Sequence, residues 1–284
     1  MTQHQFKPRR SALYMPGANA RAMEKAQNLA ADVLLFDLED AVAVDKKEEA
    51  RASLMTALAT FDYGHREKIV RVNGVASDWG LDDLRSLKTA DFDGLLLPKV
   101  ETVEQINEAL AVIDKDIAVW AMIETPKGVL NVEQIAAHEK MACLVMGTND
   151  LAKEMRVRQS SSREEFSFAF GKAIMAARAH QCDVLDGVYN QLDDNQGLVQ
   201  VCEQGALLGF DGKTLIHPKQ LEACHMAFSP SVEAISEAQA ICDAWDANNE
   251  KGVLVVNGRL VEELHVLEAQ RLIAMQAVIE QAGC

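Results

Sequence analysis

The sequence lacks several features that would define its function at once. Its six cysteines include no CxxC pair, and its net charge of -15 comes without any Lys/Arg-rich block. Nucleic acid is therefore not an expected partner. No apolar run is long enough to span a bilayer, and no apolar core follows the charged residues of MTQHQFKPRR, so neither a membrane nor a secretory signal is expected. We predict a cytoplasmic protein with free thiols.

The dinucleotide-binding fingerprint G-x-G-x-x-G is also missing after the first apolar run. The chain contains instead eight short runs of the kind found in parallel strands covered on both faces. They begin at Ser11, Val33, Lys68, Asp93, Ile117, Ala142, Cys182 and Phe210. Segments with helical spacing separate them, among them Ala20–Ala30, Lys46–Leu58, Val103–Ile113, Arg163–His180 and Asn195–Leu208. Eight such units predict a TIM (β/α)8 barrel, whereas six or fewer would have favoured an open sheet.

The pattern changes after Pro218. Two helical stretches, Ser231–Asn249 and Glu262–Gln281, flank the segment GVLVVNGRL, which has Asn257-Gly258 at a turn position and is typical of a hairpin. We therefore predict a barrel over residues 1–220 that carries a metal site. Residues 221–284 are predicted to form a C-terminal helical and hairpin extension that packs on the barrel or on a neighbouring subunit.

Active sites of such barrels lie at the C-terminal ends of the strands. Polar residues end all eight runs, and we expect them to converge on one rim: Tyr14, Glu39, Asp40, Arg71, Asn73, Lys99, Glu124, Asn149, Asp150, Asp186, Lys213 and His217. Glu124 and Asp150 follow neighbouring apolar runs, and two close carboxylates repel unless a cation lies between them. Mg²⁺ takes one or two carboxylates and leaves its other positions to water and substrate oxygens. The alternative is that Glu124 pairs with Lys99 or Lys127.

Arg71 stands among β-branched apolar residues, where its planar fork suits a carboxylate or a developing enolate oxygen. A salt bridge to Glu39 or Asp40 is the alternative, and it is compatible with this role. Gly147 permits a close backbone approach where the next helix begins, which suits a substrate carboxylate. Arg21 and Lys25 share one helix face and suit a phosphate, or else form a solvated surface.

The motifs RSALYMPG, LLFDLEDAV, RVNG, LLLPKVE, MIETPKGVLN, VMGTNDLA and GFDGKTLIHPKQ, in this order, resemble the citrate lyase β-subunit-like family of the HpcH/HpaI aldolase superfamily. The resemblance implies a homotrimeric or hexameric barrel that uses Mg²⁺, or Mn²⁺, to cleave or form a carbon–carbon bond in a 3-hydroxyacyl thioester. Citramalyl-CoA, malyl-CoA and citryl thioesters are the substrates of that family. Their products are an oxo-acid and an acetyl thioester.

The resemblance also implies roles for single residues. Glu124 and Asp150 become the metal ligands, and Arg71 contacts the thioester or oxo-acid oxygen. Glu39 and Asp40 bind metal waters and orient Arg71. The oxo-acid pocket is lined by Gly147, Thr148 and Asn149, and the CoA or acyl-carrier phosphates are held by Tyr14, Arg21 and Lys25.

One segment departs from the family pattern. The thioester lyases carry an aspartate in a C-terminal G-(K/R)-M-(V/I)-D-x-P-H segment, which acts as an acid/base in a neighbouring subunit's site. Here the segment is GRLVEELH, with Glu262 in place of the aspartate and Leu264 in place of the proline. We predict a Mg²⁺-dependent carbon–carbon lyase in which Glu262 protonates the enolate. The alternatives are an aldolase on free oxo-acids without CoA, a β-type subunit that needs an acyl-carrier partner, and a non-catalytic binding protein.

Overall fold

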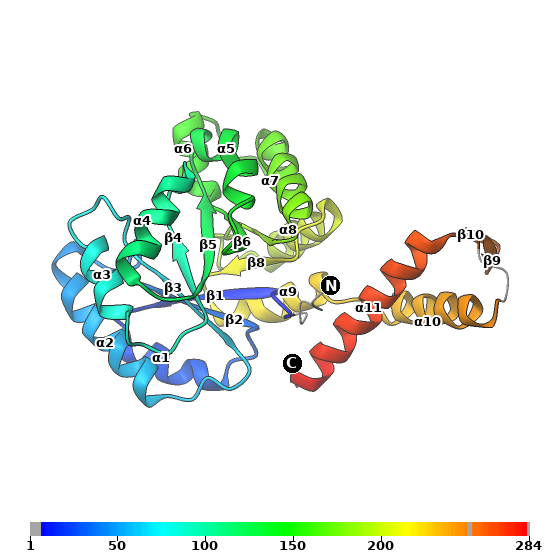
Figure 1. Ribbon diagram of the computed structural model, residues 1–284, viewed down its shortest axis with the longest axis horizontal. Helices are drawn as coiled ribbons and strands as arrows, with labels where there is room; N and C mark the ends of the chain where they lie inside the picture. The colour runs from blue at the N-terminus through cyan, green and yellow to red at the C-terminus, as the bar shows by residue number, and fades with distance from the viewer. Residues whose placement is uncertain (1–6, 249–251, 283–284) are drawn as a thin grey trace. The chain divides into compact units, whose positions relative to one another are not determined.

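The computed structural model describes residues 7–248 and 252–282. Among these residues, eight parallel strands close into a barrel in chain order, with β1 (Ser11–Pro16) paired to both β2 (Val33–Asp37) and β8 (Gly212–Leu215). The other strands are β3 (Glu67–Arg71), β4 (Gly94–Leu97), β5 (Ala118–Ile123), β6 (Met141–Met146) and β7 (Asp183–Asp186). Each lies within or directly beside a predicted run, so the predicted TIM barrel is confirmed (Figure 1).

The strands alternate between two cores, as the side-chain period of two requires. One set of residues, which includes Val33, Leu35, Trp120, Met122 and Leu185, forms a buried cluster inside the barrel. The residues of opposite parity, such as Leu34, Phe36, Ala121 and Leu144, belong to the larger cluster shared with the helices. The almost uninterrupted burial of β2 explains why its sequence is apolar throughout up to Asp37.

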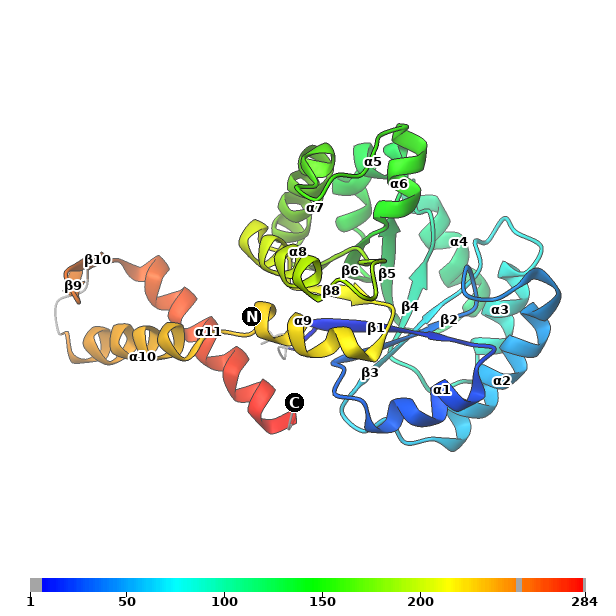
Figure 2. The ribbon, with the colours of Figure 1, turned by 180° about the vertical axis from the view of Figure 1, so that it is seen from behind.

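Helices alternate with the strands around the barrel (Figures 1 and 2). They are α1 (Ala20–Lys25), α2 (Lys47–Thr60), α3 (Gly80–Leu87), α4 (Val103–Ile113), α5 (Pro126–Ala136), α6 (Thr148–Met155), α7 (Ser167–His180), α8 (Asn195–Leu208) and α9 (Leu221–Phe228). Short 3-10 turns are η1 (Ala26–Asn28), η2 (Val44–Lys46), η3 (Glu164–Phe166) and η4 (Pro218–Gln220). Two predicted helices were too long: Ala20–Ala30 tightens into η1 after Lys25, and Arg163 adopts a left-handed conformation (φ 56°), so that α7 begins only at Ser167.

The chain divides into two compact units, one of which is Arg9–Phe228. It includes α9, which we had assigned to the extension. This helix packs on α8 and β8 and buries Leu221, Cys224 and Phe228, because the eighth βα unit needs a helix to cover its strand. How the second unit packs on the barrel or on a neighbouring subunit stays a prediction.

The second unit contains α10 (Val232–Ala247), the antiparallel pair β9 (Leu254–Val256) and β10 (Arg259–Val261), and α11 (Glu263–Ala282). The predicted end of the first helix, Asn249, lies outside the described residues. Val256, Val261 and Val266 form a small core with Trp245 and Ile241 of α10. No helix in the described parts of the chain combines the length and the apolar character needed to cross a membrane.

Candidate functional site

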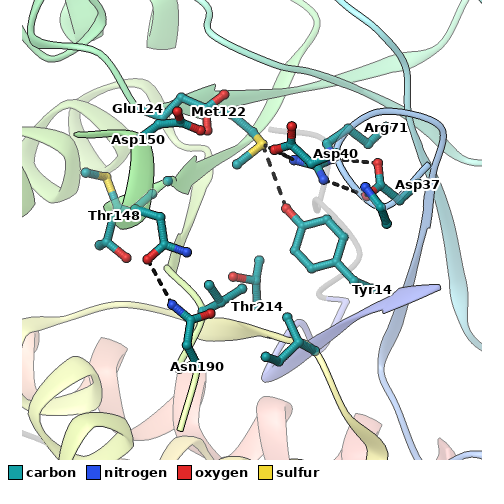
Figure 3. A pocket seen from close by; sticks show the side chains of 16 residues that line it. Tyr14, Asp37, Asp40, Arg71, Met122, Glu124, Thr148, Asp150, Asn190 and Thr214 are labelled. Atoms are coloured by element: carbon teal, nitrogen blue, oxygen red, sulfur yellow. Dashed lines mark hydrogen bonds and ion pairs between the residues drawn. The ribbon is translucent and has the colours of Figure 1, made fainter. Parts of the chain in front are cut away.

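A cavity of about 300 Å³ opens at the C-terminal ends of the strands (Figure 3). Its lining includes half of the residues that the strand-end argument selected: Tyr14, Asp40, Arg71, Glu124, Asn149 and Asp150. Gly147 and Thr148, which the sequence assigned to the oxo-acid pocket, line it as well. Arg21 and Lys25 do not line it and lie exposed on α1. Glu262 follows β10 in the second unit, where its backbone N–H donates to His265 Nδ1.

Glu124 is held at the end of β5 with only 2% of its surface exposed. Directly after it, the Thr125 hydroxyl caps α5 by accepting a hydrogen bond from Gly128 N, and Pro126 fixes the first helical turn. The strand therefore ends at Ile123 and leaves Glu124 directly beyond it. Burial raises the pKa of Glu124 to about 7, against the lowering effect of its hydrogen bond from Lys99 N and of the Arg71 charge. A carboxylate in this position needs a cation to remain ionised at low energetic cost.

Lys99 contacts both proposed metal ligands, but through different groups. Its backbone N–H donates to Glu124 Oε1 at 2.8 Å, which a left-handed conformation (φ 47°) makes accessible. Its ammonium lies 3.4 Å from Asp150 Oδ1 and is nearly half exposed. Lys127 pairs with Glu101 instead. An ion pair between Glu124 and one of these lysines was the alternative to a metal. Among these three described residues, no such ion pair is formed.

Gly147 brings the turn before α6 directly against Glu124. A Cβ atom added at this glycine would lie 2.4 Å from both Cβ and Oε2 of Glu124. Three residues later, Asp150 stands in the first turn of α6. The close backbone approach thus places the second carboxylate on the same wall of the cavity as the first (Figure 3).

These residues fit a divalent cation that keeps open positions. Across residues 7–248 and 252–282, no group of three or more His, Cys, Asp or Glu side chains forms a closed metal site. Two carboxylates on one cavity wall suit Mg²⁺, which retains water and substrate oxygens as its other ligands. In addition, Glu39 Oε2 is buried without a hydrogen-bond donor in the described structure, although it makes an ion pair, so it can accept a bond from such a water.

Arg71 is fixed by a carboxylate that the sequence argument did not single out. Asp37 accepts from Arg71 Nε at 2.8 Å and from Nη2 at 2.6 Å, a two-point contact that locks the guanidinium plane. Asp37 and Arg71 are register partners on β2 and β3. Asp37 also accepts hydrogen bonds from Glu39 N and Ala41 N, so it shapes the following loop as well.

The remaining contacts of Arg71 complete a tightly enclosed guanidinium. Its Nη1 lies 2.8 Å from Glu39 Oε2 and 3.6 Å from Asp40 Oδ2, as the predicted salt bridge required. The ring of Tyr14 stacks under the guanidinium at 4.8 Å, and the Met122 sulfur receives Nη1 at 3.5 Å. Burial raises the pKa of Glu39 to about 7, partly countered by Arg71. Tyr14 therefore lies beside Arg71 in the cavity, away from the exposed face of Arg21 and Lys25.

Thr148 lies across the cavity from Arg71 and begins α6 together with Asn149 (Figure 3). Asn149 Oδ1 accepts from Asn190 Nδ2 at 2.9 Å, and Thr148 is buried. Thr214 and Asn190 line this side too, although neither was selected from the sequence. Asn190 lies in the loop after β7, four residues beyond the last strand residue, where no apolar run points to it.

Comparison with known proteins places these residues in a family. The profile of the HpcH/HpaI aldolase/citrate lyase family matches residues 10–218. A "(3S)-malyl-CoA thioesterase" of Cereibacter sphaeroides is 49% identical over 278 residues, which cover 97% of each chain. The "Citrate lyase subunit beta" of Escherichia coli is 32% identical and covers 98% of this chain and 96% of its own.

A solved structure agrees with the sequence relatives. CitE of Mycobacterium tuberculosis, in complex with magnesium, acetoacetate and coenzyme A, superposes with a TM-score of 0.76 at 27% identity and covers 96% of this chain and 98% of its own. The predicted family is thereby confirmed. The chain belongs to the HpcH/HpaI aldolase/citrate lyase family.

Proposed function

We propose that this protein is a Mg²⁺-dependent carbon–carbon lyase that cleaves, or forms, a 3-hydroxyacyl-CoA of the malyl-CoA type. The observation that carries the proposal is the buried Glu124 carboxylate, which shares one cavity wall with Asp150 and faces the fixed guanidinium of Arg71. The names of the relatives support the substrate class, and the magnesium and coenzyme A in the CitE complex support the cofactor and the thioester.

Glu124 and Asp150 would hold the cation. Bound there, Mg²⁺ or Mn²⁺ supplies Lewis-acid polarisation of the hydroxyl and carboxylate oxygens of the substrate. Lys99 N–H and the Gly147 backbone fix the orientation of Glu124. Gly147, Thr148 and Asn149 bind the oxo-acid half, where the first N–H groups of α6 suit a carboxylate.

Arg71 would stabilise the enolate oxygen of the thioester half as a base takes the substrate's hydroxyl proton and the carbon–carbon bond breaks. Preorganised donors aimed at developing charge supply a large part of such catalysis. Asp37, Glu39 and Asp40 orient the guanidinium, so it does not have to reorganise during the reaction. The enolate carbon then takes a proton, which we assign to Glu262 of a neighbouring subunit.

This assignment to Glu262 requires a homo-oligomer, which we propose to be a trimer or a hexamer. For CoA, Arg21 and Lys25 are suitable phosphate ligands, since neither has an ion pair or a side-chain hydrogen bond with another described residue. Tyr14 would act deeper, at Arg71. We further propose a cytoplasmic location, supported by the free thiols of Cys143, Cys182, Cys202, Cys224 and Cys242; Cys284 lies outside the described residues.

One assay tests the reaction. Purified protein with Mg²⁺ is given malyl-CoA, citramalyl-CoA and citryl-CoA, and both the oxo-acid and the acetyl thioester are quantified. We expect equal amounts of the two products from at least one substrate and none in EDTA. Cleavage of none of the three would refute the proposal. An acyl-carrier protein added in parallel tests whether a carrier-bound thioester is used instead.

Thioester hydrolysis is a second candidate, because relatives named as malyl-CoA thioesterases are 46–49% identical while the citrate lyase subunits reach 32–33%. Hydrolysis would release free CoA and malate, whereas the lyase reaction releases glyoxylate and acetyl-CoA. Measuring free thiol beside glyoxylate in the same reaction separates the two. Free thiol without glyoxylate would assign the chain to hydrolysis.

A further inference from the structure

A second cavity, of about 410 Å³, lies beside the proposed metal site and has no part in the reaction above. It shares Thr148, Val188 and Asn190 with the first cavity, so these residues form the wall between them. Hydroxyl and amide side chains dominate its other walls: Gln159, Ser160, Ser161, Tyr189, Gln191 and Gln200. The cavity therefore offers many neutral hydrogen-bonding groups.

A buried ion cluster forms the floor of this cavity. Lys213 and Arg163 line the cavity with 1% and 10% of their side chains exposed, and both pair with the fully buried Asp186. Lys213 Nζ lies 2.7 Å from Asp186 Oδ2, and Arg163 Nη1 contacts both carboxylate oxygens at 2.7–2.8 Å. Two cations thus share one carboxylate, which leaves the cluster with a net positive charge in a strongly acidic protein.

Lys213 has unused hydrogen-bonding capacity. An ammonium carries three N–H donors, but in the described structure Lys213 Nζ donates a single hydrogen bond, to Asp186. Asp186 cannot accept further hydrogen bonds from Lys213, because Arg163 and Gly187 N also donate to its carboxylate oxygens. A buried charge with unmet donors is costly unless an acceptor is supplied. The cavity that Lys213 lines can supply such an acceptor.

A carboxylate that lines the cavity, Asp194, is already engaged. Asp194 accepts from the Tyr189 hydroxyl at 2.6 Å and from Gly197 N at 2.9 Å, where it caps α8 at the exposed edge of the cavity. Arg163 is mostly engaged as well: besides the two Nη1 contacts to Asp186, Nε donates to Gln204 and Nη2 to the Val201 carbonyl. Lys213 is therefore the anchor for an incoming anion.

We propose that this cavity is a second binding site for a small hydroxy- or oxo-carboxylate, whose carboxylate accepts hydrogen bonds from Lys213 Nζ. The hydroxyl and amide walls match the hydroxyl or oxo group of such an acid. The cavity is separate from the metal site, so binding requires no divalent cation. Because Thr148, Val188 and Asn190 line both cavities, an acid bound here contacts the wall of the metal site.

Isothermal titration calorimetry with L-malate tests the proposal. The full chain carries Glu124→Gln and is kept in EDTA, which removes both the cation and one of its ligands from the first cavity. We expect one saturable malate site per chain. In a Lys213→Met background the affinity should fall about tenfold or more, since a hydrogen bond to a charged group is lost. Asp186 keeps its partners Arg163 and Gly187 there, which favours folding.

Two further variants make the test specific. Gln200→Trp fills the cavity from the exposed side of α8 and should abolish malate binding without touching the ion cluster. Lys153→Met removes an exposed lysine of α6 and should leave malate binding unchanged. Malate binding that survives both Lys213→Met and Gln200→Trp would overturn the site, as would no saturable binding at millimolar malate. Equally tight binding of inorganic phosphate would overturn the assignment to a carboxylate. No step involves turnover, so failure here is distinct from failure of the proposed lyase activity.

Discussion

Substitution of Gly147 by alanine is the sharpest probe of the proposed metal site, because it changes one carbon atom and no charge. Gly147 precedes α6 with φ at -99°, a conformation that alanine adopts without strain. Any effect must therefore come from the space that the new methyl group occupies. That space is filled by the Glu124 side chain.

The expected magnitude follows from the contact distances. The alanine Cβ would lie 2.4 Å from Cβ and Oε2 of Glu124, about 1 Å short of the 3.4 Å at which ordinary contact begins. Glu124 is only 2% exposed and has no free surface into which it could retreat. A displacement of about 1 Å at a reacting centre costs roughly 100-fold in rate. Overpacking should also lower the free energy of unfolding by about 1–3 kcal/mol.

Glycine 171 supplies a matched control. It lies inside α7, and a Cβ atom added there meets nothing within 4 Å. Gly171→Ala should raise the free energy of unfolding by about 1 kcal/mol through helix propensity alone and leave Mg²⁺ affinity unchanged. Both variants are compared with the wild type by Mg²⁺ calorimetry, malyl-CoA cleavage and urea unfolding. Gly147→Ala should lose Mg²⁺ affinity by about tenfold or more, as when a group that orients a metal ligand is removed.

A folded Gly147→Ala protein with wild-type Mg²⁺ affinity and rate would refute this reasoning. It would mean that the backbone of Gly147 does not set the position of the Glu124 carboxylate. Equal losses in Gly147→Ala and Gly171→Ala would also count against it, because only the first substitution meets the proposed ligand.

Substitutions at three further residues test the other proposed roles. Glu124→Ala should lower Mg²⁺ affinity by more than the roughly 10–100-fold typical of outer-sphere changes, and full activity of this variant in EDTA would end the metal proposal. Arg71→Lys should lower kcat about 100- to 1,000-fold with unchanged circular dichroism, because lysine cannot keep the two-point contact with Asp37; a wild-type rate would remove Arg71 from the mechanism. Glu262→Gln should cost about 100-fold or more in kcat while Glu262→Asp restores most of the rate, and equal rates for both would exclude proton transfer by this residue.

The barrel was predictable because its physical signature is local. Parallel strands buried on both faces produce continuous apolar runs, and each run stands in the sequence by itself. The helices Val103–Ile113 and Asn195–Leu208 were predicted to the residue, since a capping threonine and a capping aspartate mark where they begin. The predicted start of α7 at Arg163 was wrong, because the side chain of Arg163 is used in a long-range ion pair with Asp186.

The partner of Arg71 could not be predicted in the same way. Asp37 and Arg71 face each other because β2 and β3 pair in one particular register. Register depends on the closure of the whole barrel, and a uniformly apolar run such as Val33–Phe36 gives no parity signal from which to infer it. The sequence therefore indicated the carboxylates after the strand, Glu39 and Asp40, while the principal contact is made by the last residue of the strand itself.

Parity also separates Lys213 from the cavity on which the strand-end argument had placed it. Thr214 lines the metal-site cavity, whereas its neighbour Lys213 lines the second cavity and pairs with Asp186. We had expected Lys213 and Asp186 on the same rim as Glu124. Strands β7 and β8 have only four residues each and are buried except at Asp183, so the alternation that would have distinguished inside from outside is not visible in their sequences.

Lys99 bears directly on the two interpretations of Glu124. A left-handed backbone costs a lysine about 1–2 kcal/mol, and such strain persists only where the surrounding structure enforces it. Here the strain aims the Lys99 N–H at Glu124 Oε1, while the ammonium is directed to Asp150. Glu124 therefore gains orientation from the Lys99 backbone, and the Lys99 charge favours its ionised form without a direct ion pair between the two side chains. A buried carboxylate that is positioned but left without a directly paired cationic side chain is what a site for a divalent cation requires.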